Sequence, residues 1–143
     1  MKKIVFIIMV LFIGASVQAQ KVDESAVPIS TRKAFAKMYP NVKIFKWEQN
    51  GADFEANFKE DDIQQSATYD PDGVFIRLEK LIAFTAFPQG ITDYMAKNLP
   101  GKKVKEASQI TDAAGGITYE VEIKEVDYIF DAKGNFLKKE DDK

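Results

Sequence analysis

The side chains that most enzymes use for nucleophilic or acid–base chemistry are missing from this sequence, which contains neither cysteine nor histidine. Thiol chemistry, disulfides, Cys/His zinc sites, haem ligation by histidine and imidazole-based triads are therefore excluded. Paired carboxylates can hydrolyse glycosidic bonds, but such enzymes need a deep cleft. A repeat of roughly 60 residues with one short helix has little material to build one. The sequence has no nucleophile elbow, phosphate-binding loop or dinucleotide fingerprint. We predict that the protein is not an enzyme and carries no cofactor.

One acidic segment, Asp70-Pro71-Asp72-Gly73, offers the oxygen ligands that calcium prefers. It lacks both the length of an EF-hand loop and the terminal bidentate glutamate. A second copy, Asp131-Ala132-Lys133-Gly134, has a lysine in place of a possible ligand. Because a β-turn built on Asp, Pro and Gly explains both copies, we predict that neither is a metal site.

The first 19 residues have the layout of a secretory signal peptide. Two lysines precede an apolar run from Ile4 to Ile13, and Val17 and Ala19 supply small residues before a cleavage site. The run is shorter than the roughly 20 residues that a membrane span needs. We expect cleavage after Ala19, no membrane span afterwards and a periplasmic or secreted location. Loss of the two lysines takes the net charge from −2 to −4, which disfavours nucleic acid as a partner.

An internal repeat divides the rest of the chain. Ala36-Lys37-Met38-Tyr39-Pro40 is matched by Ala96-Lys97-Asn98-Leu99-Pro100, and Phe54-Glu55-Ala56-Asn57-Phe58 by Tyr119-Glu120-Val121-Glu122-Ile123. The two aspartate–glycine turns correspond in the same order. We predict a tandem duplication, with this organisation: a signal peptide at 1–19, an N-terminal extension at 20–26, a first repeat at 27–86 and a second repeat at 87–143.

Each repeat predicts one short helix followed by four strands. Ser30 and Thr92 can cap the helices, and Pro40 and Pro100 end them. Alternation and turn signals predict the strands, at 42–49, 54–58, 63–69, 74–80, 103–111, 117–124, 126–131 and 135–139. The predicted fold class is α+β: a duplicated α-β-β-β-β unit that forms an antiparallel sheet of up to eight strands, with helices on one face.

Residues 79–90 join the two repeats and are too apolar for a free linker. We expect the last strand of the first repeat to continue into a buried crossover that holds the repeats together. The alternative is a surface patch that recruits a partner.

Packing and turn residues form a pattern over nearly the whole chain after the signal peptide: Val27-Pro28, Ala34-Phe35, Tyr39-Pro40, Trp47, 54–58, 69–73, Ala86-Phe87-Pro88, Leu99-Pro100, Tyr119-Glu120-Val121 and 130–134. This pattern resembles the PepSY-like periplasmic proteins, whose fold is related to that of the beta-lactamase inhibitory protein. The resemblance implies a secreted, non-enzymatic tandem αβ4 domain that binds or inhibits a protein partner. Unlike the beta-lactamase inhibitor, this chain has no cysteine, so neither its inhibition nor any inhibitory residue is carried over.

Two aromatic residues, Phe45 and Trp47, are candidate partner-binding residues. They lie on one face of the first predicted strand, and the second repeat has Lys105 and Ala107 at these positions. An exposed Trp–Phe pair is typical of a binding hot spot. The alternatives are a β-bulge that turns one ring into the core, or packing of Trp47 at the junction of the repeats.

These observations predict an exported, non-catalytic binding module whose sheet face contacts an unknown protein or peptide partner in the cell envelope. The alternative is a small-molecule or envelope-stress sensing domain that binds its ligand between helices and sheet. An apolar cavity under the helices would favour the sensing domain, whereas an exposed concave aromatic face would favour the binding module.

Overall fold

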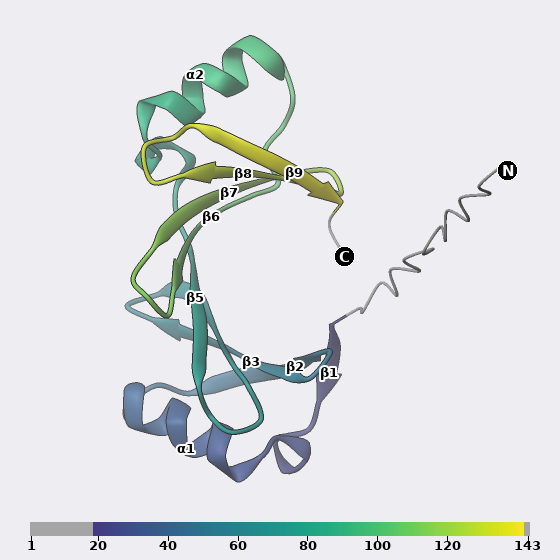
Figure 1. The fold of residues 1–143 in the computed structure, drawn as a ribbon, viewed down its shortest axis with the longest axis vertical. Helices are drawn as coiled ribbons and strands as arrows, with labels where there is room; N and C mark the ends of the chain where they lie inside the picture. Colours follow the sequence, from purple (N-terminus) through teal and green to yellow (C-terminus); the bar gives the residue numbers. More distant parts are fainter. Residues whose placement is uncertain (1–18, 142–143) are drawn as a thin grey trace, which may run out of the picture.

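Residues 19–141 are described by the computed structural model, and they form one curved antiparallel sheet with two helices on its outer side (Figure 1). Residues 1–18, which contain nearly all of the expected signal peptide, lie outside the described part. The helices are α1 (Ile29–Met38) and α2 (Gln89–Asn98), each preceded by a short 3-10 turn, η1 (Glu24–Ala26) and η2 (Phe84–Ala86). The strands lie side by side in chain order: β1 (Gln20–Val22), β2 (Ile44–Asn50), β3 (Asp53–Glu60), β4 (Ile63–Tyr69), β5 (Phe75–Leu81), β6 (Glu106–Asp112), β7 (Ile117–Ile123), β8 (Val126–Asp131) and β9 (Phe136–Asp141).

The same order of elements, a 3-10 turn, a helix and four strands, occurs twice along the described chain. The sheet has nine strands where at most eight were expected. The additional strand β1 pairs with β2 through only three residues, Gln20–Val22, and such a short segment carries no clear alternation of apolar and polar residues.

The helix starts predicted from Ser30 and Thr92 are wrong, because both residues lie inside their helices. The N-cap positions are Pro28 and Pro88, and neither makes a side-chain cap. The fixed φ of proline suits entry into a helix, and its missing N–H needs no partner there. The two hydroxyls instead bond to carbonyls: Ser30 Oγ donates to Pro71 at 2.5 Å, and Thr92 Oγ1 donates to Gln89 at 2.8 Å.

Two hydrophobic cores lie between the helices and the sheet. In the first, the Phe35 ring of α1 packs against Phe58 with centroids 5.2 Å apart and edge-on to Trp47 at 6.0 Å. In the second, Ile91 and Met95 of α2 are buried with residues of β6, β7 and β8. Since each helix is too short to be stable alone, burial of these side chains against the sheet holds both helices in place.

The prediction that the last strand of the first repeat continues into a segment packed against the second repeat is confirmed, but this segment is not buried throughout: Phe87 is buried, whereas Ala83, Thr85 and Ala86 are exposed. Strand β5 pairs directly with β6, and the Ile82 N–H donates to the Ala107 carbonyl at 3.0 Å. Phe84 and Phe87 then meet edge to face with centroids 5.5 Å apart, and Phe87 is buried in the second core. The sheet therefore continues without a break from one repeat to the next.

Candidate functional site

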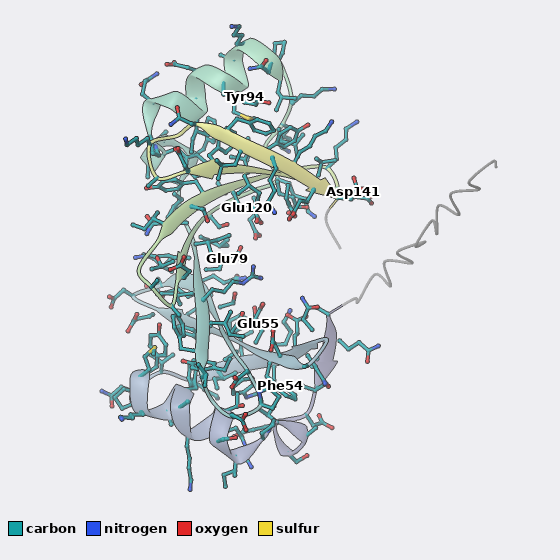
Figure 2. All side chains as sticks on the ribbon, viewed as in Figure 1. Phe54, Glu55, Glu79, Tyr94, Glu120 and Asp141 are labelled. Carbon is teal, nitrogen blue, oxygen red and sulfur yellow. The ribbon has the colours of Figure 1, made fainter. Side chains whose placement is uncertain are left out.

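The inner face of the curved sheet is the face that neither helix covers (Figure 1). Where the strands are regular, its side chains alternate with those of the core side: on β3, for example, Glu55 lies between the buried Phe54 and Ala56. Cross-strand register keeps Glu55 on the same face as Thr68 of β4 and Arg77 of β5. The face is therefore one mainly polar surface that runs across both repeats, although register also places Ile110 and Ile129 on it, beside Glu79 and Glu120. Figure 2 shows Glu55, Glu79 and Glu120 along it.

A cleft of about 340 Å³ follows this face and is lined by ten residues, of which eight are carboxylates. From the first repeat it takes Asn50, Glu55, Arg77 and Glu79. From the second it takes Glu106, Glu120, Glu122, Asp127, Glu140 and Asp141. We call this set of residues the acidic trough. Arg77 is the one cation among its lining residues, so carboxylates greatly outnumber positive charges there.

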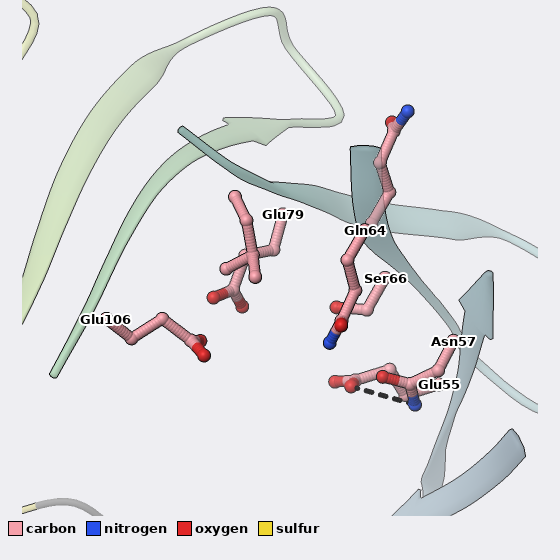
Figure 3. Close-up of a pocket in the computed structure, with 8 residues that line it drawn as sticks. Glu55, Asn57, Gln64, Ser66, Glu79 and Glu106 are labelled. Atoms are coloured by element: carbon pink, nitrogen blue, oxygen red, sulfur yellow. Dashed lines mark hydrogen bonds between the residues drawn. The ribbon is translucent and has the colours of Figure 1, made fainter. Parts of the chain in front are cut away.

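The middle of the acidic trough holds two half-buried carboxyls. Burial raises the pKa of Glu55, and the negative charge of Glu79 raises it further, against an opposing effect of Arg77. Burial also raises the pKa of Glu79, again opposed by Arg77. Figure 3 shows the carboxylates of Glu55, Glu79 and Glu106 turned toward a shared space, with Asn57 bonded to Glu55. Crowded, partly dehydrated carboxylates of this kind favour a positively charged neighbour.

Lysines pair with carboxylates at the two ends of the inner face. Lys46 Nζ lies 2.9 Å from Glu48 Oε2 in the first repeat. In the second repeat, Lys105 pairs with Glu122 and Lys138 pairs with Glu140. The Lys138–Glu140 pair is exposed and contributes little to stability, about 0–1 kcal/mol. In the other two pairs the carboxylate side chains are largely buried, Glu48 at 20% and Glu122 at 12% exposed.

Replacing Glu79 by glutamine should raise the free energy of unfolding at neutral pH. The folded-state pKa of Glu79 lies above its ordinary value of 4.5, so the folded protein binds this proton more tightly than the unfolded chain does. Stability therefore falls as the pH rises from about 4.5 through the folded-state pKa. Urea unfolding at several pH values should show the variant's advantage at pH 7 and its disappearance on acidification.

The matched control for this prediction is Glu125→Gln, in the exposed turn between β7 and β8. Its unfolding free energy should stay within about 0.5 kcal/mol of the wild-type value. Equal effects of the two substitutions would show that Glu79 has no unfavourable environment in the fold.

Phe45 and Trp47 do not form an exposed pair. The register of β2 with β3 shifts between Ile44 and Lys46, which is the β-bulge considered above. Trp47 is 4% exposed and lies in the first core, whereas Phe45 is 53% exposed. Partner binding stays a prediction, now confined to Phe45. The buried Trp47 Nε1–H has no hydrogen-bond partner among the described residues.

The aspartate–glycine turns use their carboxylates within the backbone. Asp70 Oδ1 accepts the N–H groups of Asp72 at 2.9 Å and Val74 at 2.8 Å. Asp131 and Asp112 accept two N–H groups in the same way. The hydrogen bonds from Asn135 hold the pKa of the Asp131 carboxyl below its ordinary value. Within residues 19–141, no group of three or more acidic side chains has the arrangement of a metal site.

Calorimetric titration of the metal-free protein with calcium or zinc should therefore give no saturable heat at micromolar metal. The aspartates that could be ligands already accept backbone N–H groups, and a new ligand role would break those turns. A stoichiometric heat together with a rise in melting temperature would contradict this expectation.

Comparison with known proteins places the fold in a family. The family model described as "Putative beta-lactamase-inhibitor-like, PepSY-like" matches residues 15–77 and again 65–138. The chain belongs to this PepSY-like family. Two matches in tandem cover most of the chain, which confirms the resemblance inferred from its packing and turn residues. Among curated proteins, none matches the chain in sequence.

Solved structures of Bacteroides proteins share the PepSY-like fold. A periplasmic protein from Bacteroides eggerthii has a TM-score of 0.72 at 18% identity, with 80% of this chain and 88% of that chain covered. A BLIP-like protein from Bacteroides fragilis has a TM-score of 0.61 at 22% identity, with coverages of 78% and 84%. The expected periplasmic or secreted location agrees with the description of the Bacteroides eggerthii protein as periplasmic. No helix within the described residues is long and apolar enough to cross a membrane.

The acidic trough was missed at the level of sequence, although β3 and each strand from β5 to β9 carried part of the signal. Glu120 and Glu122 alternate with Tyr119 and Val121 in β7. Strand periodicity therefore predicts that the two glutamates point away from the core that the helices cover. Counting the acidic residues at all strand positions that point away from the core would have revealed the excess of carboxylates on that face. The curvature that draws the carboxylates into one cleft has no comparable local signal.

Proposed function

We propose that this PepSY-like protein is an exported, non-catalytic binding module that contacts a protein or peptide partner through the inner face of its sheet. The uncovered, concave sheet face that spans both repeats carries this proposal. Broad sheet faces that no other element covers are suited to contact with another polypeptide, because they present many side chains on one rigid scaffold.

Packing on the other side of the sheet favours this function over ligand binding beneath the helices. The Tyr39 ring lies 4.6 Å from the Phe58 ring, and Tyr94 lies 5.3 Å from Phe130. These rings fill the space between each helix and the sheet, where a small-molecule sensor would hold its ligand. The exposed Phe45 lies beside Val22 and Asp23 at the edge of the sheet and can add an apolar contact for a partner.

We further propose that the two αβ4 repeats arose by tandem duplication. The repeated order of elements and the two tandem family matches support this origin. The division of the mature chain at residues 86 and 87 follows from it.

Site-specific photo-crosslinking in the cell envelope tests the proposed binding face. A photoreactive phenylalanine analogue replaces Gln64, which is exposed on β4 at the inner face, or Lys37, which is exposed on α1. We expect a discrete crosslinked adduct from position 64 and none from position 37. Adducts from position 37 alone would assign binding to the helix side and contradict the proposal.

A further inference from the structure

We propose that the acidic trough binds a lysine- and arginine-rich segment of the partner protein. This inference rests on the proposed function and specifies the chemistry of the partner. It concerns the middle of the inner face, where both repeats contribute carboxylates.

Charge complementarity is the first argument. Eight carboxylates and one guanidinium line the trough, and the lysines nearest to its ends already pair with Glu122 and Glu140. A concave surface of one sign concentrates its field, speeds the encounter with an oppositely charged partner and selects against acidic ones. The repulsion between Glu55 and Glu79 is relieved when a cation lies between them.

The second argument comes from an unpartnered hydroxyl. Thr68 is 8% exposed, and its Oγ1 has no hydrogen-bond partner among the described residues. Register places it between Glu55 on β3 and Arg77 on β5, and it lines a hollow that shares both of these residues with the trough. A buried polar group without a hydrogen-bond partner is energetically unfavourable. An ammonium or guanidinium N–H from a bound segment can supply the missing donor.

The shape of the cleft favours an extended segment over a folded domain in the trough itself. Its lining residues come from β2, β3 and every strand from β5 to β9, while its volume is only about 340 Å³. That space accepts a few long side chains laid across the strands. Lysine and arginine reach such a floor with flexible apolar stems while their charged ends meet carboxylates.

Binding of a fluorescent oligolysine peptide, followed by anisotropy, tests the inference. The trough variant carries Glu55→Gln, Glu79→Gln and Glu120→Gln together. The control variant carries Glu24→Gln, Asp72→Asn and Asp93→Asn, three exposed carboxylates outside the trough. Both variants change the net charge equally. Glutamine and asparagine preserve side-chain size, and circular dichroism checks that both variants fold.

We expect the trough variant to bind oligolysine at least about tenfold more weakly than wild type, and the control to stay within about twofold. An increase from about 50 to about 300 mM salt should weaken wild-type binding at least about tenfold. Oligoglutamate should not bind. If both variants bound oligolysine equally more weakly, the loss would come from net charge alone and the inference would be overturned. Spermine binding as tight as oligolysine binding would also overturn it.

The crosslinking experiment separates this inference from the proposed function. If the adduct at position 64 persists in the trough variant and at high salt, the inner face binds a partner that is not cationic. The proposed function then stands and the inference fails. If no adduct forms at position 64, the proposed function itself fails, whatever the behaviour of oligolysine.

Discussion

Replacing Trp47 by alanine should lower the free energy of unfolding by about 3–5 kcal/mol. The indole is 4% exposed and packs edge-on to Phe35 in the first core. Its removal leaves a cavity between α1 and the sheet that the surrounding rings cannot fill without strain. Thermal or urea unfolding of the variant measures this loss directly.

Phe45 provides the matched control, because it is two residues away and 53% exposed. Phe45→Ala should change the unfolding free energy by less than about 0.5 kcal/mol. The wild-type protein contains a single tryptophan, so its fluorescence reports on Trp47 alone. It should be blue-shifted and resistant to iodide quenching. A readily quenched tryptophan, with little loss of stability in Trp47→Ala, would place the indole at the surface and contradict the structure.

Phe45 and Trp47 show which structural features the alternation of apolar and polar residues predicts and which it does not. Alternation and turn signals predict eight of the nine strands: β4 occupies the predicted residues 63–69, whereas β6 begins at Glu106 where residue 103 was predicted. Alternation also predicts that Phe45 and Trp47 share a face. The register shift between Ile44 and Lys46 breaks this periodicity, because one additional residue in a strand reverses the direction of the side chains that follow. A bulge depends on pairing with the neighbouring strand, so the sequence of one strand does not reveal it.

The candidate site was less predictable than the fold for a related reason. The turn and core residues occur at matching positions in both repeats, so comparing the repeats identifies them from the sequence. The carboxylates of the trough repeat only in part: Glu55 and Glu79 have counterparts in Glu120 and Glu140, whereas Asp127 stands where the first repeat has Ser66. Their common location depends on the direct pairing of β5 with β6 and on the curvature of the whole sheet (Figure 1).

Replacing Gly73 by alanine should destabilise the protein by about 2–4 kcal/mol, the combined effect of a strained backbone and an overpacked contact. Gly73 has φ +85°, and a Cβ at this position would lie 2.7 Å from the Ser30 carbonyl oxygen of α1. The same turn receives the Thr31 hydroxyl, which donates to the Asp70 carbonyl at 2.8 Å. The variant must therefore move the turn away from the helix, and its melting temperature should fall accordingly.

Gly101 separates the two contributions to this loss. It has φ +71°, but a Cβ there would meet no atom within 4 Å. Gly101→Ala should therefore cost only the backbone strain, about 1 kcal/mol. If the two variants lost the same stability, the close contact between the turn and α1 would not exist in solution. A clearly larger loss for Gly73→Ala would instead show that the Asp70–Gly73 turn holds α1 on the outer side of the sheet, which leaves the inner face uncovered.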